Sequence, residues 1–171
     1  MLLEDVLALA AEAEGDAGAY EIAARNAVRA LVAPAGKVDP ALLEREQFAA
    51  HGLAWIATYV AALRQMCRWA EAGGQDELEL LMLQSAYGEY LAQLSGGIAI
   101  SQVEIVRPGD LGLDSAALDT PPVRKLIAAN TAAVRLRIAE LIGDSLESGN
   151  FGALGLDDEA LGEVRRQFRR F

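Results

Sequence analysis

Histidine and cysteine are almost missing from this 171-residue chain, which contains one of each. With His51 alone, a di-iron bundle site built from two Glu-x-x-His motifs is impossible, and a Ser-His-Asp triad would have to use this residue. With Cys67 alone, an intrachain disulfide and a Cys-rich zinc site are excluded, and nothing indicates an oxidising compartment. The sequence therefore predicts a cytoplasmic protein that carries no metal and no self-sufficient catalytic site.

Long hydrophobic runs and an excess of positive charge are lacking as well. No segment approaches the roughly 18 apolar residues of a membrane span, and no basic region precedes an apolar stretch at the N-terminus. The formal net charge of −10 would repel nucleic acid phosphates and anionic lipids, which bind clustered Lys and Arg. We therefore expect neither membrane association nor nucleic-acid binding.

The residues that are abundant favour helices. Hydrophobic residues make up 53% of the chain and aromatic residues only 6%, and most of the apolar content is Ala and Leu. The periodicity predicts an all-α protein, an up-and-down helical bundle with three long helices and shorter flanking helices. The expected division is a bundle domain over residues 1–143 and a linker with the start of a further helix over 144–171.

Capping residues and glycines give the expected helix boundaries in the first half of the chain. Gly15 separates a helix over 2–14 from one over 19–32, and Asp39, followed by proline, starts a long helix over 40–72. The middle of this long helix is apolar nearly all round, so we expect it to be the central, most buried element. Its predicted buried stripe is Phe48, Gly52, Trp55, Tyr59, Leu63, Met66 and Ala70.

In the second half, a helix is predicted from Asp76 to Gly96 and another over 121–142. Residues 98–106 partly alternate between apolar and polar, and we favour a helix there because an isolated strand would have no partner. In the helix over 121–142, Asn130 and Arg137 interrupt the apolar stripe, which indicates a polar contact inside the molecule or with a neighbouring subunit.

Several side chains are candidates for a pocket or interface. Trp55, Tyr59, Tyr87 and Tyr90 could line an aromatic pocket, although aromatic residues at helical spacing more often fill the core. For His51 the favoured interpretation is a partly buried histidine that is hydrogen-bonded within the bundle. Cys67 is expected to be buried and inert. No residue is predicted to be catalytic, to bind a cofactor or to bind a metal.

Three stretches of the sequence resemble a known family: Leu43–Gln65, Gly88–Ile98 and Ser101–Leu113. They are similar to the N-terminal helical extension of the methylsuccinyl-CoA dehydrogenase group of acyl-CoA dehydrogenases. The resemblance implies that the parent protein binds FAD and oxidises a methylsuccinyl thioester to mesaconyl-CoA in the ethylmalonyl-CoA pathway, with a glutamate that removes the α-proton. All residues for that chemistry would follow Phe171, so none is assigned here.

The last residues, Val164–Phe171, reverse the acidic character of the chain with four arginines and two phenylalanines. A nucleic-acid or lipid-binding tail and a favourable interaction with the helix dipole are both possible interpretations. The segment is also similar to the opening of the first helix of the dehydrogenase fold. This similarity indicates that the natural polypeptide continues.

The expected function is that of an accessory helical domain, not catalytic alone, which packs on the dehydrogenase domain in cis within a homo-oligomeric parent. Two alternatives remain open. One is a free-standing bundle that binds proteins through the faces of Asn130 and Arg137. The other is a binder of small apolar ligands that uses a cleft around Trp55, Tyr59 and Tyr87.

Overall fold

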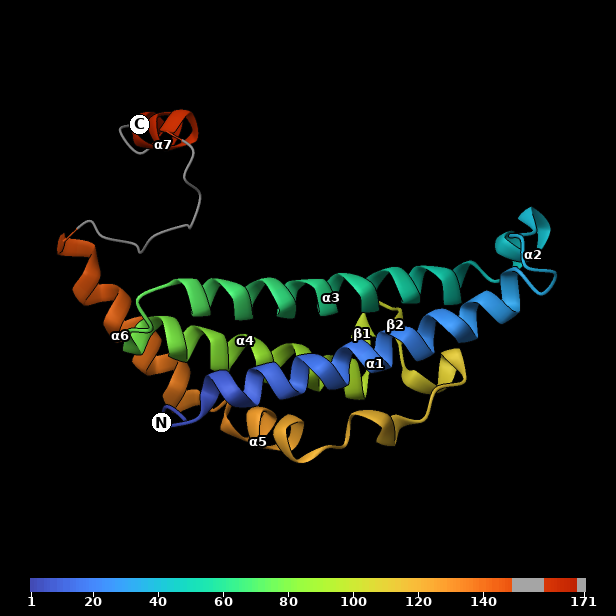
Figure 1. Ribbon diagram of the computed structural model, residues 1–171, viewed down its shortest axis with the longest axis horizontal. Coiled ribbons are helices and arrows are strands. Elements are labelled where there is room, and N and C mark those ends of the chain that lie inside the picture. The colour runs from blue at the N-terminus through green and yellow to red at the C-terminus, as the bar shows by residue number, and fades with distance from the viewer. Residues whose placement is uncertain (149–158, 169–171) are drawn as a thin grey trace.

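The computed structural model describes residues 1–148 and 159–168. Three long helices run side by side in alternating directions (Figure 1): α1 (Val6–Val32), α3 (Gln47–Ala72) and α4 (Glu77–Gly96). Four shorter helices accompany them: α2 (Pro40–Arg45), α5 (Pro121–Ala129), α6 (Ala132–Ser148) and α7 (Glu159–Phe168). The predicted all-α bundle with three long helices is thus confirmed. None of the described helices combines the length and apolarity that a bilayer crossing requires.

The predicted capping residues Asp39 and Asp76 each start a helix, but the single long helix expected over 40–72 was wrong, because the chain breaks at Glu46 between α2 and α3. The carboxylate of Asp39 accepts a hydrogen bond from the backbone N–H of Ala41 at 2.8 Å, at the start of α2. Asp76 accepts one from the backbone N–H of Glu79 at 2.8 Å and starts α4. These bonds satisfy backbone donors that have no partner within the first helical turn. The Asp76 cap fixes the point at which the chain turns back on itself between α3 and α4.

The prediction of two helices before residue 33 was wrong, because α1 runs through Gly15 without a break. Its buried face is continuous across this position, from Ala10, Ala13 and Ala17 to Tyr20. A helical glycine costs about 1 kcal/mol relative to alanine, and burying a face of this length outweighs that cost. The glycine therefore does not end the helix.

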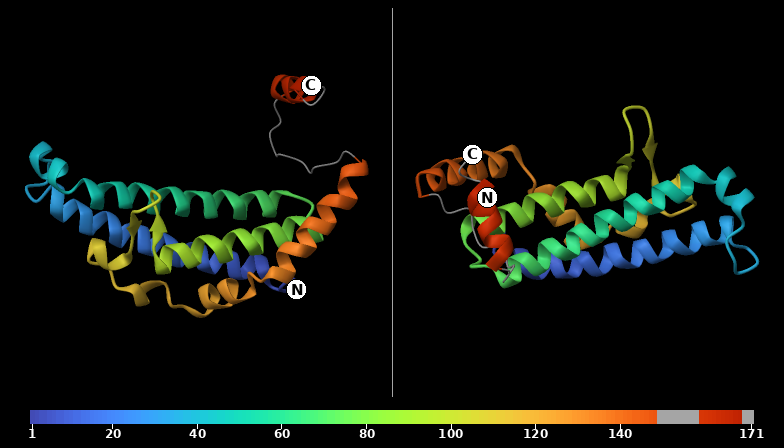
Figure 2. Two further views of the ribbon diagram at one scale, coloured as in Figure 1. Left: turned by 180° about the vertical axis from the view of Figure 1, so that it is seen from behind. Right: turned by 90° about the horizontal axis from the view of Figure 1, so that it is seen from above.

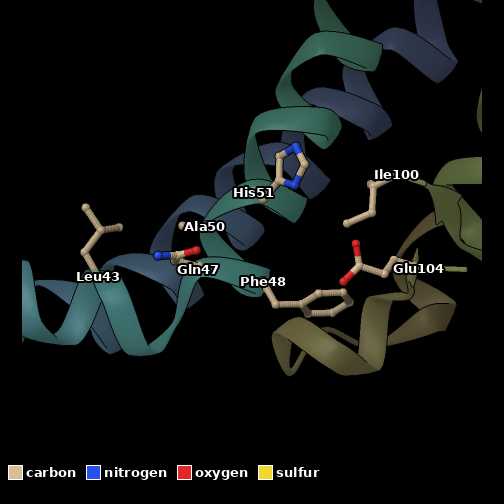
Figure 3. Close-up of a pocket in the computed structure, with 7 residues that line it drawn as sticks. All are labelled: Leu43, Gln47, Phe48, Ala50, His51, Ile100 and Glu104. Carbon is tan, nitrogen blue, oxygen red and sulfur yellow. The ribbon is translucent and has the colours of Figure 1, made fainter.

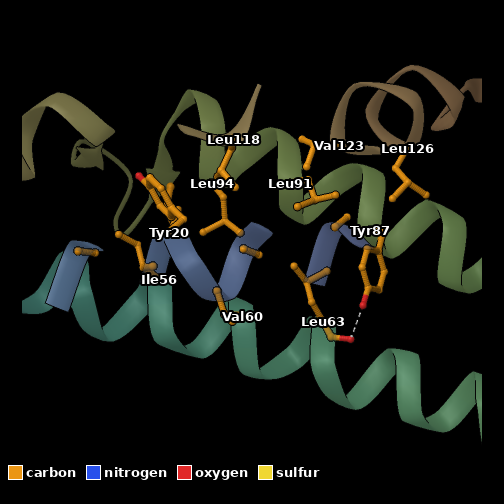
Figure 4. Close-up of a cluster of buried hydrophobic side chains, with 14 of the residues drawn as sticks. Tyr20, Ile56, Val60, Leu63, Tyr87, Leu91, Leu94, Leu118, Val123 and Leu126 are labelled. Carbon is orange, nitrogen blue, oxygen red and sulfur yellow. Dashed lines mark hydrogen bonds between the residues drawn. The ribbon is translucent and has the colours of Figure 1, made fainter. Parts of the chain in front are cut away.

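The central element is α4, and the prediction that α3 would be central was also wrong. α4 contacts α1, α3, α5 and α6, whereas α3 lies at one side of the bundle and packs mainly on α1 and α4 (Figures 1 and 2). The core between these helices is shown in Figure 4 and contains fully buried side chains such as Val60, Leu63, Leu91 and Leu126. The outer side of α3 consequently has no covering element among the described residues.

The buried stripe of α3 is rotated from the predicted one. Gly52, Leu63 and Ala70 are buried as expected, but the remaining buried positions of the helix are Ala49, Ile56, Val60 and Cys67. Phe48 is 40% exposed, and Trp55 and Tyr59 are only partly buried. Most of the buried residues of α3 are small or β-branched, which allows close packing of the helix in the bundle. The large aromatic residues Trp55 and Tyr59 lie at the edge of the core.

Residues 98–106 form a hairpin, not the predicted helix. β1 (Ile98–Ala99) and β2 (Ile105–Val106) pair antiparallel, with Ile98 opposite Val106. Gly97 ends α4 at a φ of +132°, which directs the chain out of the helix. The hairpin then packs on α3, where a Cβ added to Gly52 would lie 2.7 Å from Val106 Cγ1. Each strand of the hairpin is the pairing partner of the other, so the argument that a strand here would be isolated was wrong.

The predicted helix over 121–142 is divided into α5 and α6 at Asn130 and Thr131. The Thr131 hydroxyl accepts a hydrogen bond from the backbone N–H of Val134 at 3.4 Å and starts the second helix. Two short 3-10 turns, Pro108–Leu111 and Ser115–Leu118, connect the hairpin to α5. α6 continues to Ser148, beyond the expected end, and diverges from the bundle (Figure 2).

The division of the chain at residue 143 stays a prediction. Most of the predicted linker, residues 149–158, lies outside the described residues. α7 follows from Glu159, as expected, and Phe168 at its end is 76% exposed. Residues 169–171 of the basic end also lie outside the described part of the chain.

Candidate functional site

A hollow of about 520 Å³ lies between the start of α3 and the hairpin (Figure 3). The hairpin contributes Ile100 and Glu104, and the α2–α3 region contributes Leu43, Gln47, Phe48, Ala50 and His51. Figure 3 shows the side chains of Phe48 and His51 on the side of the hollow that faces Ile100 and Glu104. No Lys or Arg is among the lining residues, so the phosphates of an anionic ligand would find no positive partner there.

A row of aromatic rings extends from this hollow along α3 to α4. The ring centroids of His51 and Trp55 are 6.2 Å apart, and those of Trp55 and Tyr59 are also 6.2 Å apart in an edge-to-face arrangement. Tyr59 stacks on Tyr90 of α4 at 4.7 Å. We call Phe48, His51, Trp55, Tyr59 and Tyr90 the aromatic ridge. Phe48 and His51 are exposed, and the other three are partly buried.

The polar atoms of the ridge bond to one another or to α4. Trp55 Nε1 donates a hydrogen bond to His51 Nε2 at 2.9 Å. The Tyr59 hydroxyl donates to Gln93 Oε1 at 2.7 Å. Partial burial, with the nearby Tyr90 and Glu89, raises the pKa of Tyr59. These bonds tie Trp55 to His51 within α3 and Tyr59 to Gln93 of α4.

Tyr87 belongs to a different environment from the other aromatic candidates. It is fully buried, and its hydroxyl donates to the backbone carbonyl of Leu63 at 2.9 Å (Figure 4). Burial raises its pKa well above the ordinary tyrosine value. The structure therefore brings Trp55, Tyr59 and Tyr90 together but separates Tyr87 from them, and a cleft shared by Trp55, Tyr59 and Tyr87 does not form.

The ridge lies on an outer helix face that has no fixed charge. Between Gln47 and Leu63 the sequence contains no Asp, Glu, Lys or Arg. A helix that meets water on one side ordinarily carries charged residues there, as α1 does with Glu12, Arg25 and Arg29. The exposed positions of α3 in this interval include Ala54, Thr58 and Ala61. The exposed side of α3 is thus uncharged in its first part, and exposed charged residues return at Arg68 and Glu71.

Asn130 and Arg137 lie away from the ridge and join α4 to the α5–α6 region. The side-chain amide of Asn130 donates to Glu89 at 3.2 Å, and its oxygen accepts from the Ser85 hydroxyl at 3.2 Å. Arg137 makes a bidentate ion pair with Glu77, with Nε donating to Oε1 at 2.9 Å and Nη2 donating to Oε2 at 2.8 Å. Both side chains have partners within the chain, and these contacts orient the start of α6.

Cys67 is buried in the contact between α3 and its neighbours. Burial is the main cause that raises the pKa of its thiol, and the nearby carboxylate of Glu71 adds to the effect. A thiol with a raised pKa is a poor nucleophile. Among residues 1–148 and 159–168, no group of three or more His, Cys, Asp and Glu side chains is placed to hold a metal ion.

Two features of the site were not predicted. The hairpin residues Ile100 and Glu104 complete the hollow, and their contribution depends on the strand pairing that the sequence argument rejected. Gln84, fully buried in α4, bonds to the backbone of Leu3 at 2.8 Å and to that of Ala129 at 3.2 Å. A glutamine within an otherwise apolar helix segment, Leu80–Leu83 before it, was the available signal for this buried polar link.

Fold and surface together define an all-α helical domain with an aromatic row beside a hollow, on a long helix that carries no charged residue between Gln47 and Leu63. No protein-family model matches the chain. It is, however, 49% identical over 99% of its length to (2S)-methylsuccinyl-CoA dehydrogenase of Cereibacter sphaeroides. The resemblance inferred from the sequence is therefore confirmed, and the chain is homologous to part of that enzyme.

The extent of the match differs greatly between the two proteins. The aligned region includes nearly all of this chain but only 32% of the relative. The chain thus spans about one third of the length of the protein it resembles. The match therefore relates this chain to a part of that dehydrogenase, and the described residues of the chain are mostly helical, with one short hairpin between α4 and α5.

Proposed function

We propose that this chain is the accessory N-terminal helical domain of a flavin-dependent acyl-CoA dehydrogenase that converts methylsuccinyl-CoA to mesaconyl-CoA. The observation that carries the proposal is 49% identity along almost the whole chain to one third of a methylsuccinyl-CoA dehydrogenase. In this proposal FAD and substrate bind to the remaining part of a cytoplasmic, homo-oligomeric parent. The helical domain packs on that part and shapes access to it.

The hollow beside His51 has no cationic lining residue, so we assign the binding of the CoA phosphates to another part of the parent. The helices α1, α3, α4 and α5 share one hydrophobic core, and the Arg137–Glu77 ion pair joins α6 to the start of α4.

The test begins with the natural reading frame that contains this sequence. We expect it to continue past Phe171 into a dehydrogenase region, and the full polypeptide to bind FAD and oxidise methylsuccinyl-CoA with an artificial electron acceptor. Flavin absorbance and the disappearance of substrate are the measurements. A stop codon directly after Phe171, or a full polypeptide that binds no flavin, would contradict the proposal.

A second candidate function is a free-standing bundle that binds a protein partner, and the exposed Phe48 and His51 at one end of the aromatic ridge favour it. This function predicts that the 171-residue chain alone forms a specific oligomer or complex. Multi-angle light scattering of the chain over a range of concentrations measures this directly. A monomer at all concentrations, together with a reading frame that continues, would favour the accessory domain.

A further inference from the structure

We propose that the joint between α5 and α6 is a two-state hinge. Contacts with α4 hold the two helices bent, and loss of those contacts lets them join into one straight helix. The proposal goes beyond the proposed function and does not depend on it. It is drawn from two observations: the sequence across the joint is helical in character, and the carbonyl groups that a continuous helix would use accept hydrogen bonds from other donors.

The sequence across the joint contains no residue that ordinarily ends a helix. Between positions 123 and 142 there is neither Pro nor Gly. Only Asn130 and Thr131 favour caps and turns, and each costs a helix interior less than a glycine does. The joint is flanked by four alanines, the strongest helix formers: Ala128, Ala129, Ala132 and Ala133. The bend therefore has only a weak local cause.

The carbonyl group of Ala129 shows how α4 replaces a helical hydrogen bond. In a continuous helix this carbonyl would accept from the backbone N–H of Ala133. Here it accepts from Nε2 of the buried Gln84 in α4 at 3.2 Å, and from the backbone N–H of Thr131 at 3.0 Å. The carbonyl thus has a donor in the bent state as well as in a straight one, and the donor from α4 favours the bend.

The next carbonyl group, that of Asn130, follows the same pattern. In a continuous helix it would accept from the backbone N–H of Val134. In the structure the Val134 N–H donates to the Thr131 hydroxyl at 3.4 Å, and Arg135 Nη1 donates to the Asn130 carbonyl at 3.4 Å. Two side chains therefore take over the partners of one helical hydrogen bond.

One face of α4 holds the bent joint in place, and we call Gln84, Ser85, Gly88 and Glu89 the α4 seat. Gly88 allows a close approach, since a Cβ built on it would lie 2.4 Å from Asn130 Cβ. The Ser85 hydroxyl donates to Asn130 Oδ1 at 3.2 Å, and Asn130 Nδ2 donates to Glu89 Oε2 at 3.2 Å. These contacts hold Asn130 at φ −79° and ψ 75°, outside the helical region.

Beyond the joint, few contacts hold α6 on the bundle. Among the side chains of α6 that the structure describes, only Val134 is fully buried, while Leu136 is 63% exposed. The Arg137–Glu77 ion pair is exposed to solvent, and exposed ion pairs contribute little to stability. Segments with few buried contacts open at a lower free energy than the core does. α6 can therefore leave its place while α1, α3 and α4 stay packed.

The direction of α6 depends on the state of this hinge. α6 diverges from the bundle beyond the joint (Figures 1 and 2), so a straight α5–α6 helix would carry its far end to a different position. Under the proposed function, a dehydrogenase region follows α6 in the polypeptide. The hinge would then set the orientation of the bundle relative to that region.

The experiment measures the distance between two spin labels in the 171-residue chain by pulsed electron paramagnetic resonance. The labels are attached to cysteines that replace the exposed Arg124 of α5 and Asp144 of α6, and Cys67→Ala removes the native thiol. These positions are 20 residues apart in the sequence, so one continuous helix would separate their Cα atoms by about 30 Å. With the unaltered joint we expect a single, shorter distance.

A double substitution at the joint tests the role of the α4 seat. Asn130→Ala with Thr131→Ala removes the side-chain contacts with the seat and the cap of α6, and it raises the helix propensity of the joint. We expect a second distance near 30 Å, which the unaltered joint lacks. The matched control is Thr58→Ala in α3, where the hydroxyl bonds only to the carbonyl of Ala54, and it should leave the distance unchanged.

A proline then distinguishes a second helical state from a loosened fold. Ala132 is the first residue of α6, a position at which helices accept proline. Inside a continuous α5–α6 helix the same proline would remove a backbone hydrogen bond and clash with the preceding turn. Ala132→Pro added to the double alanine variant should therefore restore the single shorter distance.

Two results would refute the hinge. If the double alanine variant keeps the short distance alone, the α4 seat does not decide the bend. If the variant gives a broad distribution that Ala132→Pro does not narrow, α6 is a flexible segment without a second helical state. Neither result affects the proposed function, which is tested by the reading frame and by flavin binding.

Discussion

An alanine at Gly88 should destabilise the protein, whereas the same substitution at Gly15 should stabilise it. Both glycines lie inside helices, in α4 and α1 respectively. A Cβ built on Gly88 would be 2.4 Å from Asn130 Cβ and 2.8 Å from the backbone oxygen of Leu126. A Cβ built on Gly15 would have nothing within 4 Å. The two variants thus make one chemical change in two different surroundings.

The expected magnitudes follow from opposing contributions. In a helix interior, Gly→Ala gains about 1 kcal/mol because alanine loses less conformational entropy. At Gly15 this gain stands alone, so stability should rise by about 0.5–1 kcal/mol. At Gly88 the atoms in the way belong to or adjoin the backbone of α5 and cannot rotate aside. An overpacking cost of about 3 kcal/mol less the helix gain leaves a net loss of about 2 kcal/mol.

The assay is urea unfolding followed by circular dichroism, with the two alanine variants and the unaltered chain measured side by side. The change in the midpoint at a constant slope gives the change in the free energy of unfolding. A stabilised Gly88→Ala variant would show that α4 and α5 are not in close contact, and the arrangement of the core would then be refuted. A destabilised Gly15→Ala variant would contradict the continuous helix α1.

Three further predictions concern single side chains. Leu91→Ala, at a fully buried position, should cost about 2–5 kcal/mol in urea unfolding, while Leu136→Ala, at a position 63% exposed, should change stability by less than about 0.5 kcal/mol. Because burial raises the pKa of the Cys67 thiol, a thiol reagent at mildly alkaline pH should label it only after unfolding, and fast labelling of the native chain would refute its placement. The hydrogen bond from Arg137 lowers the folded-state pKa of Glu77. The stabilisation by this pair is therefore complete above the ordinary glutamate pKa and is lost as the pH falls through the lowered pKa. Glu77→Gln should reduce the dependence of stability on pH in the acid range, and the effect of the substitution should be smaller at high salt.

Helix starts could be predicted from the sequence because they depend on neighbouring residues. The Asp39 and Asp76 caps need only a side-chain oxygen and the backbone N–H groups two or three residues later. Gly15 has the same local appearance as a helix end, but Ala13 and Ala17 on either side of it are buried, because α1 packs on α3, α4 and α5. The continuity of α1 at Gly15 thus depends on contacts between residues distant in sequence, and rules that use only neighbouring residues cannot predict it.

The candidate site could be predicted only in part for the same reason. The spacing of His51, Trp55 and Tyr59 places them on one side of a helix, and the structure shows their rings in contact. Whether that side faces the core depends on how α3 is rotated about its axis against α1 and α4. The prediction placed Trp55 in the core, whereas the structure buries the next residue, Ile56. Tyr87 and Tyr90 lie less than one turn apart on α4, yet Tyr87 is buried and Tyr90 only partly buried, and their spacing alone does not predict this difference.

The apolar character of α3 on all sides was interpreted as a sign of full burial, and the structure gives it another meaning. One side of the helix packs in the core of this domain, and the other bears ordered aromatic rings without a charge from Gln47 to Leu63. A helix that meets water on its outer side does not need such a composition, and the exposed apolar area opposes solubility. An apolar sequence on all sides of a helix therefore does not establish full burial, because Ala54 and Thr58 of α3 are exposed although Ile56, which lies between them in the sequence, is in the core.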